Sequence, residues 1–111
     1  FVAQIGRASL DRADIWQGYP GLPLKGALQL LKFQKAVLAE LPEIHQPLLI
    51  CQGRLDTTVH PQAGELILRA VRSKVKEHHW LEKSSHVITL DQELERVVEI
   101  TLAFIEKALG N

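Results

Sequence analysis

Apolar residues recur at steps of three and four positions over residues 24–41, which is the spacing of one buried face of a helix. Pro42 follows directly and cannot continue a helix, so we expect the helix to end there. The apolar face consists of Leu24, Ala27, Leu28, Leu31, Leu38 and Leu41, and Leu30, Phe33 and Val37 widen it. Residues 1–23 lack this periodicity, and their Gly and Pro residues indicate a loop with one short helical turn.

A different pattern, a short continuous apolar run, occupies residues 47–51 and is bounded by Pro47 and Gly53. Such a run is typical of a strand that is buried on both faces, as in a parallel sheet. Residues 52–60 form a loop, after which Pro61 stands where the first residue of a helix belongs. The buried stripe of that helix consists of Ala63, Leu66, Ile67, Ala70 and Val71.

The last third of the chain predicts one more strand and one more helix. Residues 75–81 indicate a strand, and residues 84–90 a loop. Thr89 and Gln92 have the spacing of a capping box, so we expect them to open the last helix, which Gly110 ends. The apolar positions of this helix are Leu94, Val97, Val98, Thr101, Ile105 and Ala108.

The predicted order is therefore helix, strand, helix, strand, helix. A strand–helix–strand sequence implies a right-handed parallel crossover. Two parallel strands leave an open edge and do not make a stable sheet alone. The sequence thus predicts an α/β fold, the last β-α-β-α part of a larger doubly wound sheet. Because the chain begins at Phe1 and contains no methionine, we expect it to be a piece of a longer protein.

Composition narrows the function mainly by exclusion. The 111 residues suffice for one small domain, and 13 basic residues balance 13 acidic ones without a basic stripe, so no nucleic-acid partner is expected. No apolar run approaches the ~20 residues of a membrane span, and no signal-peptide pattern opens the chain. The single cysteine, Cys51, excludes an intrachain disulfide and favours a reducing compartment, the cytoplasm.

Two loops carry the candidate chemistry, because reactive groups in open α/β sheets gather just past the carboxyl ends of the strands. Asp56 follows the first strand and His86 follows the second. Adjacent parallel strands would bring these two loops side by side. A carboxylate bonded to one ring nitrogen of a histidine fixes its tautomer and leaves the other nitrogen free to take a proton from a hydroxyl. The sequence therefore predicts that Asp56 and His86 can meet as a carboxylate–imidazole pair of this kind.

The residues around these side chains carry a specific resemblance. Residues 47–56 are similar to the strand and acid loop of α/β-hydrolases, and residues 80–91 resemble the histidine loop of bacterial carboxylesterases of the monoacylglycerol-lipase type. The resemblance covers residues 47–109, and residues 24–41 resemble, more loosely, the helix that leads out of the cap of such enzymes.

The resemblance implies a division of the chain and a reaction. Residues 1–46 would be a cap remnant with its connecting helix, and residues 47–111 the C-terminal β-α-β-α part of the hydrolase core. The family's order along the chain is nucleophilic serine, acid, base, and Asp56 and His86 match the second and third positions. The implied activity is hydrolysis of a small-molecule ester through an acyl-enzyme, without a cofactor.

Two features depart from the family pattern. The residue before the histidine is usually Gly, but here it is Ser85, whose β-carbon could strain the loop or shift the imidazole. The nucleophile elbow, Gly-x-Ser-x-Gly, is absent. None of the serines (Ser9, Ser73, Ser84 and Ser85) is predicted on a tight strand-to-helix turn. We therefore expect the chain to supply acid and base without a nucleophile and to be inactive alone.

Simpler interpretations stay open for several residues. Asp56 could cap a turn, and His86 could be structural. His78 and His79 are adjacent in a strand, so they point to opposite faces, and no pair spacing supports a metal site. We expect Arg54 to be solvated and Cys51 to fill the core. Trp16 and Tyr19 could either line an acyl pocket or pack the cap.

A second hypothesis assigns the chain to a different class. It would be a non-catalytic module that offers its open sheet edge to a partner. That partner would be a second copy of the chain or the N-terminal half of the same enzyme.

Overall fold

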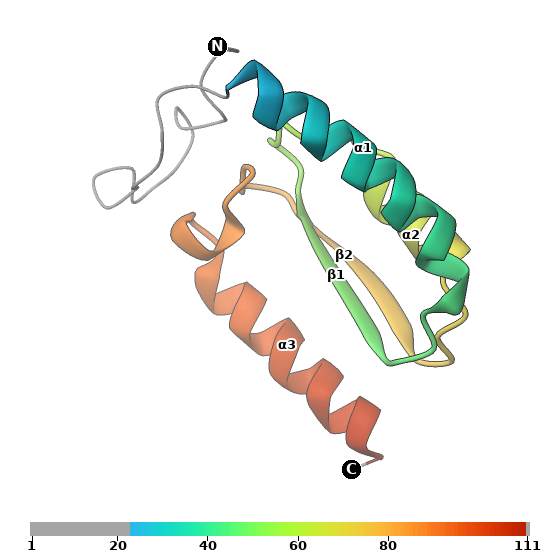
Figure 1. The fold of residues 1–111 in the computed structure, drawn as a ribbon. Coiled ribbons are helices and arrows are strands. Elements are labelled where there is room, and N and C mark those ends of the chain that lie inside the picture. The colour runs from blue at the N-terminus through green and yellow to red at the C-terminus, as the bar shows by residue number, and fades with distance from the viewer. Residues whose placement is uncertain (1–22, 111) are drawn as a thin grey trace.

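The computed structural model describes residues 23–110, in which three α-helices surround two parallel strands (Figure 1). Their order is the one that the apolar patterns predict. The elements are α1 at Leu24–Glu40, β1 at Leu48–Gly53, α2 at Ala63–Ala70, β2 at Lys76–Leu81 and α3 at Leu94–Leu109. Short 3₁₀ turns lie at Leu41–Glu43 and Ile88–Leu90.

Most helices and strands begin and end near the predicted residues, but hydrogen bonds shift the end of β1 and the start of α2. Pro42 ends α1 as expected, and the chain continues into the 3₁₀ turn. Strand β1 runs to Gly53, two residues past the predicted end, because its pairing with β2 continues that far. Helix α2 begins at Ala63 and not at Pro61. A turn precedes it, in which the Ala63 N–H donates to the His60 carbonyl at 2.9 Å.

The predicted capping box at Thr89 and Gln92 is wrong. Helix α3 begins later, with Glu93 at the N-cap position and no side-chain capping hydrogen bond. The Gln92 N–H donates to the carboxylate of its neighbour Asp91, and the Glu93 carboxylate turns away toward residues 83 and 84. At the other end Gly110 adopts the left-handed conformation (φ 76°), as predicted, and closes the helix.

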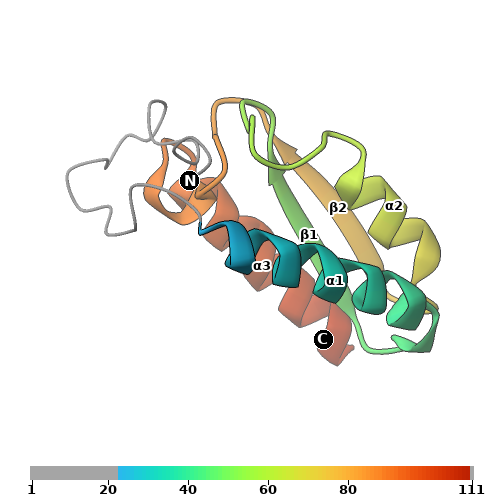
Figure 2. The same cartoon turned by 45° about the horizontal axis from the view of Figure 1, so that its top comes forward.

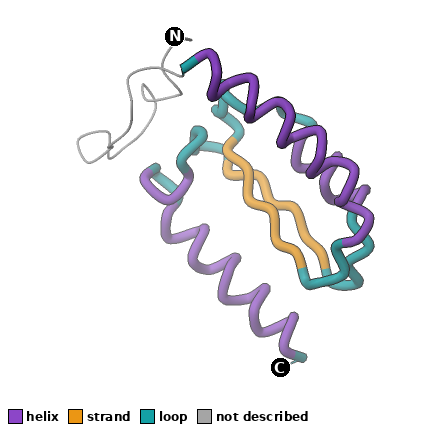
Figure 3. The backbone as a smooth tube through the Cα atoms, viewed as in Figure 1, coloured by secondary structure: helices purple, strands orange, loops and turns teal. Residues whose placement is uncertain are grey.

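The two strands form the middle layer, with α1 and α2 on one side and α3 on the other (Figures 1 and 2). Their parallel register pairs Leu48 with Lys76 at one end and Gly53 with Leu81 at the other. The carboxyl ends of both strands consequently lie next to each other, and the loops that follow them lie together (Figure 3). This register places the acid loop beside the histidine loop.

The core lies between the sheet and α3. Leu81 is 1% exposed and packs with Val97 and Ile100, with Leu49, Cys51 and Ile88 around them. Full burial of a side chain such as Leu81 stabilises the fold by about 2 kcal/mol. The other side of the molecule is different, because α1 has no buried residue. Within residues 23–110, none of the helices has the length and apolar content of a membrane span.

Candidate functional site

Asp56 and His86 meet at the carboxyl ends of the two strands. The Nδ1 of His86 lies 3.0 Å from Oδ2 of Asp56. The Asp56 side chain is 6% exposed, whereas the His86 side chain is 32% exposed. The carboxylate is thus shielded from water while the imidazole keeps an accessible side, which is the geometry of an acid that orients a base.

Backbone pairing between the two loops fixes this encounter. Beyond the strands, the Arg54 N–H donates to the Leu81 carbonyl at 2.8 Å, and the Leu55 N–H donates to the Ser84 carbonyl at 2.9 Å. The loops approach so closely that a β-carbon on Gly53 would lie 2.1 Å from the Ser85 carbonyl oxygen. Only glycine allows the histidine loop to cross the end of β1 at this distance.

The two oxygens of Asp56 have separate partners. Oδ1 accepts the N–H groups of Thr58 (2.7 Å) and Val59 (3.1 Å), which folds the acid loop around the carboxylate. Oδ2 remains for His86. The turn-capping interpretation of Asp56 and the acid interpretation are therefore compatible, because one carboxylate makes both sets of contacts.

Electrostatics favour the ionised form of this carboxyl. Burial, the largest single influence, raises the pKa of Asp56, but the hydrogen bonds from His86, Thr58 and Val59 together outweigh it and hold that pKa below its ordinary value. An ionised carboxylate only accepts hydrogen bonds. Nδ1 of His86 is therefore the hydrogen-bond donor in its contact with Oδ2 of Asp56.

The serine before His86 does not displace the imidazole. No non-glycine residue in the range 23–110 has a positive φ, so Ser85 needs no glycine-only conformation. Its N–H and hydroxyl both donate to Oδ2 of Asp91, each at 2.7 Å. The concern that this β-carbon strains the loop or shifts the ring is wrong, because the side chain has a buried partner and Nδ1 still faces Asp56.

Arg54 has more contacts than a solvated loop residue. Its guanidinium lies 3.8 Å from the Trp80 ring centroid and donates twice to Glu82, at 3.0 and 3.1 Å. The hydrogen bond from Arg54 also lowers the pKa of Glu82. These contacts tie the start of the acid loop to β2. No local sequence pattern predicted them, since Arg54 lies far from both Trp80 and Glu82 along the chain.

No serine in the described part of the chain is presented as a nucleophile. Ser84 and Ser85 are buried, with hydroxyls that donate to carboxylates. Ser73 is 5% exposed and precedes β2, at the opposite end of the sheet from the site. Burial raises the pKa of the Cys51 thiol, which keeps it protonated and a poor nucleophile. Ser9, Trp16 and Tyr19 lie outside the described residues.

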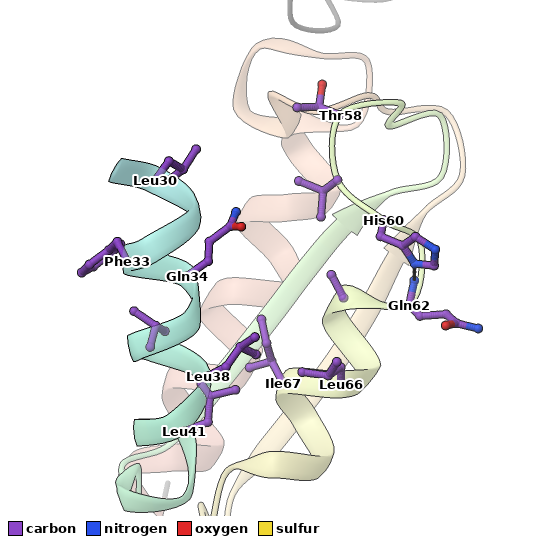
Figure 4. Close-up of a pocket in the computed structure, with 13 residues that line it drawn as sticks. Leu30, Phe33, Gln34, Leu38, Leu41, Thr58, His60, Gln62, Leu66 and Ile67 are labelled. Atoms are coloured by element: carbon purple, nitrogen blue, oxygen red, sulfur yellow. Dashed lines mark hydrogen bonds between the residues drawn. The ribbon is translucent and has the colours of Figure 1, made fainter. Parts of the chain in front are cut away.

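Two hollows adjoin the acid loop. One, of about 200 Å³, is bordered by Cys51, Asp56 and His86. The other is an apolar groove of about 620 Å³ between α1 and α2, into which Leu38, Leu41 and Ile67 project (Figure 4). Val59 borders both hollows.

The histidines of β2 do not gather around a common point. His79 contacts Glu77 at 2.7 Å, and Lys107 of α3 contacts the same carboxylate at 2.6 Å. His78 instead packs against Trp80, with ring centroids 5.0 Å apart. Among residues 23–110, no group of three or more His, Cys, Asp or Glu side chains is arranged to hold a metal ion.

Comparison with known proteins connects this geometry to one family. Residues 10–93 match the family described as serine aminopeptidase, S33. A carboxylesterase of Bacillus subtilis (strain 168) is 34% identical over 64 residues, which cover 58% of this chain and 26% of that protein. A thermostable monoacylglycerol lipase of Bacillus sp. (strain H-257) is 33% identical over 104 residues, 93% of this chain and 42% of the lipase.

A solved structure from work on LipS and LipT, two metagenome-derived lipolytic enzymes, superimposes with a TM-score of 0.75 at 41% identity. The alignment covers 81% of this chain and 37% of that one. The chain thus spans less than half the length of each of these relatives. The predicted α/β fold, a parallel sheet with flanking helices as in an α/β-hydrolase, is confirmed. Because the family match extends over residues 10–93, the chain belongs to the serine aminopeptidase, S33, family of hydrolases.

Proposed function

We propose that this chain is the C-terminal part of a serine carboxylesterase or lipase and supplies Asp56 and His86 as the acid and base of ester hydrolysis. The observation that carries the proposal is the 3.0 Å contact between Nδ1 of His86 and Oδ2 of a buried Asp56. The order of the two residues along the chain agrees with the order of acid and base in α/β-hydrolases.

The chemistry follows from the protonation states. A serine outside residues 23–110 would attack the ester carbonyl while Nε2 of His86 takes the hydroxyl proton. His86 then gives this proton to the leaving alcohol, which leaves an acyl-enzyme. In the second half, His86 takes a proton from water, the hydroxide attacks the acyl carbon, and the proton returns to the serine. Asp56 stays ionised and stabilises the imidazolium each time.

A small-molecule ester is the proposed substrate class. The family description names an aminopeptidase, but the relatives are a carboxylesterase, a monoacylglycerol lipase and lipolytic enzymes. Nothing in the mechanism requires a cofactor. A cytoplasmic location remains a prediction that rests on the single cysteine, Cys51.

A chimeric enzyme tests the proposal. This chain would replace the matching part of the Bacillus monoacylglycerol lipase, and hydrolysis of a short-chain p-nitrophenyl ester would be measured. We expect His86→Ala to lower kcat by about 10⁴-fold in the chimera. His45→Ala, at an exposed histidine before β1, is the matched control and should leave activity unchanged.

The isolated chain provides the complementary measurement. We expect it to hydrolyse the ester no faster than its own His86→Ala variant, because residues 23–110 present no nucleophile. Turnover by the isolated chain that His86→Ala abolishes would contradict the claim of a missing nucleophile. Full activity of the His86→Ala chimera would contradict the assigned base.

A second candidate function rests on the open edge of the sheet. Among the described residues β1 pairs only with β2, so its other edge has no partner strand, and α1 exposes apolar side chains beside it. In this alternative the chain is a non-catalytic module that assembles through this edge with the N-terminal half of the enzyme or with a second copy. Light scattering after size-exclusion chromatography tests the second-copy form, which a well-folded monomer would contradict.

A further inference from the structure

The residue directly before His86, Ser85, is held by the carboxylate of Asp91, at the end of the histidine loop. Ser85 is 1% exposed and Asp91 is 4% exposed. The N–H and the hydroxyl of Ser85 both donate to Oδ2 of Asp91 at 2.7 Å. The Gln92 N–H donates to the other oxygen at 2.9 Å. Three donors therefore converge on one buried carboxylate, and such hydrogen bonds are stronger than those between neutral groups.

This contact bears directly on the orientation of the His86 ring. Ser85 is joined to His86 by one peptide bond, so fixing its N–H and side chain restricts the backbone from which the ring projects. On the opposite side, the Ser84 carbonyl accepts the Leu55 N–H of the acid loop. The loop that carries His86 is thus held by two anchors, the backbone of the acid loop and the carboxylate of Asp91.

We propose that Asp91 is a positioning residue for His86, acting through Ser85. The inference rests on the proposed function, since it concerns how the base of that function is oriented. Asp91 keeps Nδ1 of His86 directed at Oδ2 of Asp56, which in turn keeps the lone pair on Nε2. The Ser85 hydroxyl adds a second hydrogen bond to the oxygen that already accepts its N–H.

Glu93 supplies a matched comparison. Its Oε2 accepts the Lys83 N–H and the Ser84 hydroxyl, each at 2.7 Å. It is therefore also a carboxylate that anchors the histidine loop from the segment before α3. Its contacts lie two and three residues before His86, however, and not at the adjoining residue. The Glu93→Ala variant therefore tests whether the loss of any anchor of the histidine loop is enough to turn the His86 ring away from Asp56.

The experiment measures the tautomer of His86 in the full chain by long-range ¹H–¹⁵N correlation NMR at about pH 8, where imidazole is neutral. In the wild type we expect the proton on Nδ1. Asp91→Ala should lower the ratio of the Nδ1–H to the Nε2–H tautomer by about tenfold, the effect of losing a hydrogen bond to a charged group. Asp91→Asn should retain the ratio, because its amide oxygen can still accept from Ser85. Glu93→Ala should retain it as well.

The outcomes separate this inference from the function on which it rests. A wild-type chain without the Nδ1–H tautomer would overturn the Asp56–His86 pair itself. An Nδ1–H tautomer that persists in Asp91→Ala would overturn only the positioning role. Equal losses in Asp91→Ala and Glu93→Ala would also overturn it, since the effect would then be general loosening of the loop.

Removal of a buried carboxylate can also unfold the chain, so a measurement on the wild type accompanies the variants. Amide hydrogen exchange of the Ser85 N–H reports the anchor directly, because that N–H must leave Asp91 before it exchanges. We expect exchange as slow as that of the β2 amides. If Asp91→Ala does not fold, fast exchange at Ser85 in the wild type overturns the proposal and slow exchange supports it.

Discussion

Asp56 makes local and long-range contacts with the same carboxylate. Oδ1 organises its own loop through Thr58 and Val59, and Oδ2 reaches His86 thirty positions later. The fold therefore gains stability from the group that the proposed chemistry requires. At the residue scale, a substitution here should change both the orientation of the imidazole and the pH dependence of stability.

The Asp56→Asn variant tests the second effect. The pKa of Asp56 is lowered in the folded state, so its ionised form stabilises the fold above the unfolded value of about 3.9. This stabilisation is lost as the pH falls through the lower, folded pKa. We expect Asp56→Asn to reduce the free energy of unfolding at about pH 6, and the difference from the wild type to shrink toward about pH 2. Urea unfolding followed by tryptophan fluorescence measures the free energy of unfolding of both proteins at each pH. A difference between them that does not change with pH would contradict a stabilising, ionised Asp56.

Gly53 tests how closely the two loops must approach. A β-carbon there would lie 2.1 and 2.4 Å from the carbonyl oxygens of Ser85 and Ser84, and backbone atoms cannot move aside cheaply. We expect Gly53→Ala to lower the free energy of unfolding by at least about 2 kcal/mol in urea.

Gly26 is the matched control for this substitution. It lies in α1 with nothing within 4 Å of its β-carbon position. Gly26→Ala should therefore stabilise the chain by roughly 0.5–1 kcal/mol. A Gly53→Ala variant as stable as the wild type would show that the loops can separate without cost.

At the scale of elements, helix α3 and the segment before it support the histidine loop. The α3 residues Val97 and Ile100 pack on Leu81, the last residue of β2. The segment just before the helix carries Asp91 and Glu93. Packing of α3 therefore determines where those two carboxylates meet the loop. The site depends on a helix that contributes no proposed catalytic residue.

Two leucine-sized residues on opposite faces of α3 test this dependence. Ile100 is 6% exposed and lies in the core, whereas Leu102 is 57% exposed. We expect Ile100→Ala to cost about 3 kcal/mol in urea unfolding, because it leaves a cavity beside the sheet. Leu102→Ala should change stability by less than about 0.5 kcal/mol. Similar losses for both variants would indicate that α3 does not pack as described.

At the scale of the whole molecule, burial is uneven. The side of the sheet that faces α3 has a packed core, but the side with α1 exposes large apolar side chains. These are Leu24, Leu28, Leu31, Phe33 and Leu38, each at least 50% exposed. Exposed apolar surface of this extent is typical of an interaction face. We therefore propose that any assembly of the chain, in either candidate function, would involve this side and the open edge of β1.

Charge on α1 tests that placement. The double substitution Leu31→Lys and Phe33→Lys adds two positive charges to side chains that are 61% and 66% exposed, so the fold itself should tolerate it. We expect the isolated wild-type chain to form dimers or larger species in size-exclusion chromatography with light scattering, and the double variant to shift toward monomer. An unchanged distribution would indicate that association does not involve α1.

The amino-acid sequence by itself determined the element order, the parallel character of the strands and the expectation that Asp56 and His86 lie together. These follow from local signals: apolar runs and periodicity, Pro42 and Gly110 as terminators, and a family-like segment around each loop. Only the tertiary structure decided how the site is held. The close approach at Gly53, the contacts of Arg54 and the anchoring of Ser85 by Asp91 all join groups that no sequence period relates. The capping-box prediction failed for the same physical reason, since the carboxylates before α3 bind the neighbouring loop, and hydrogen bonds made across space outweighed a local preference.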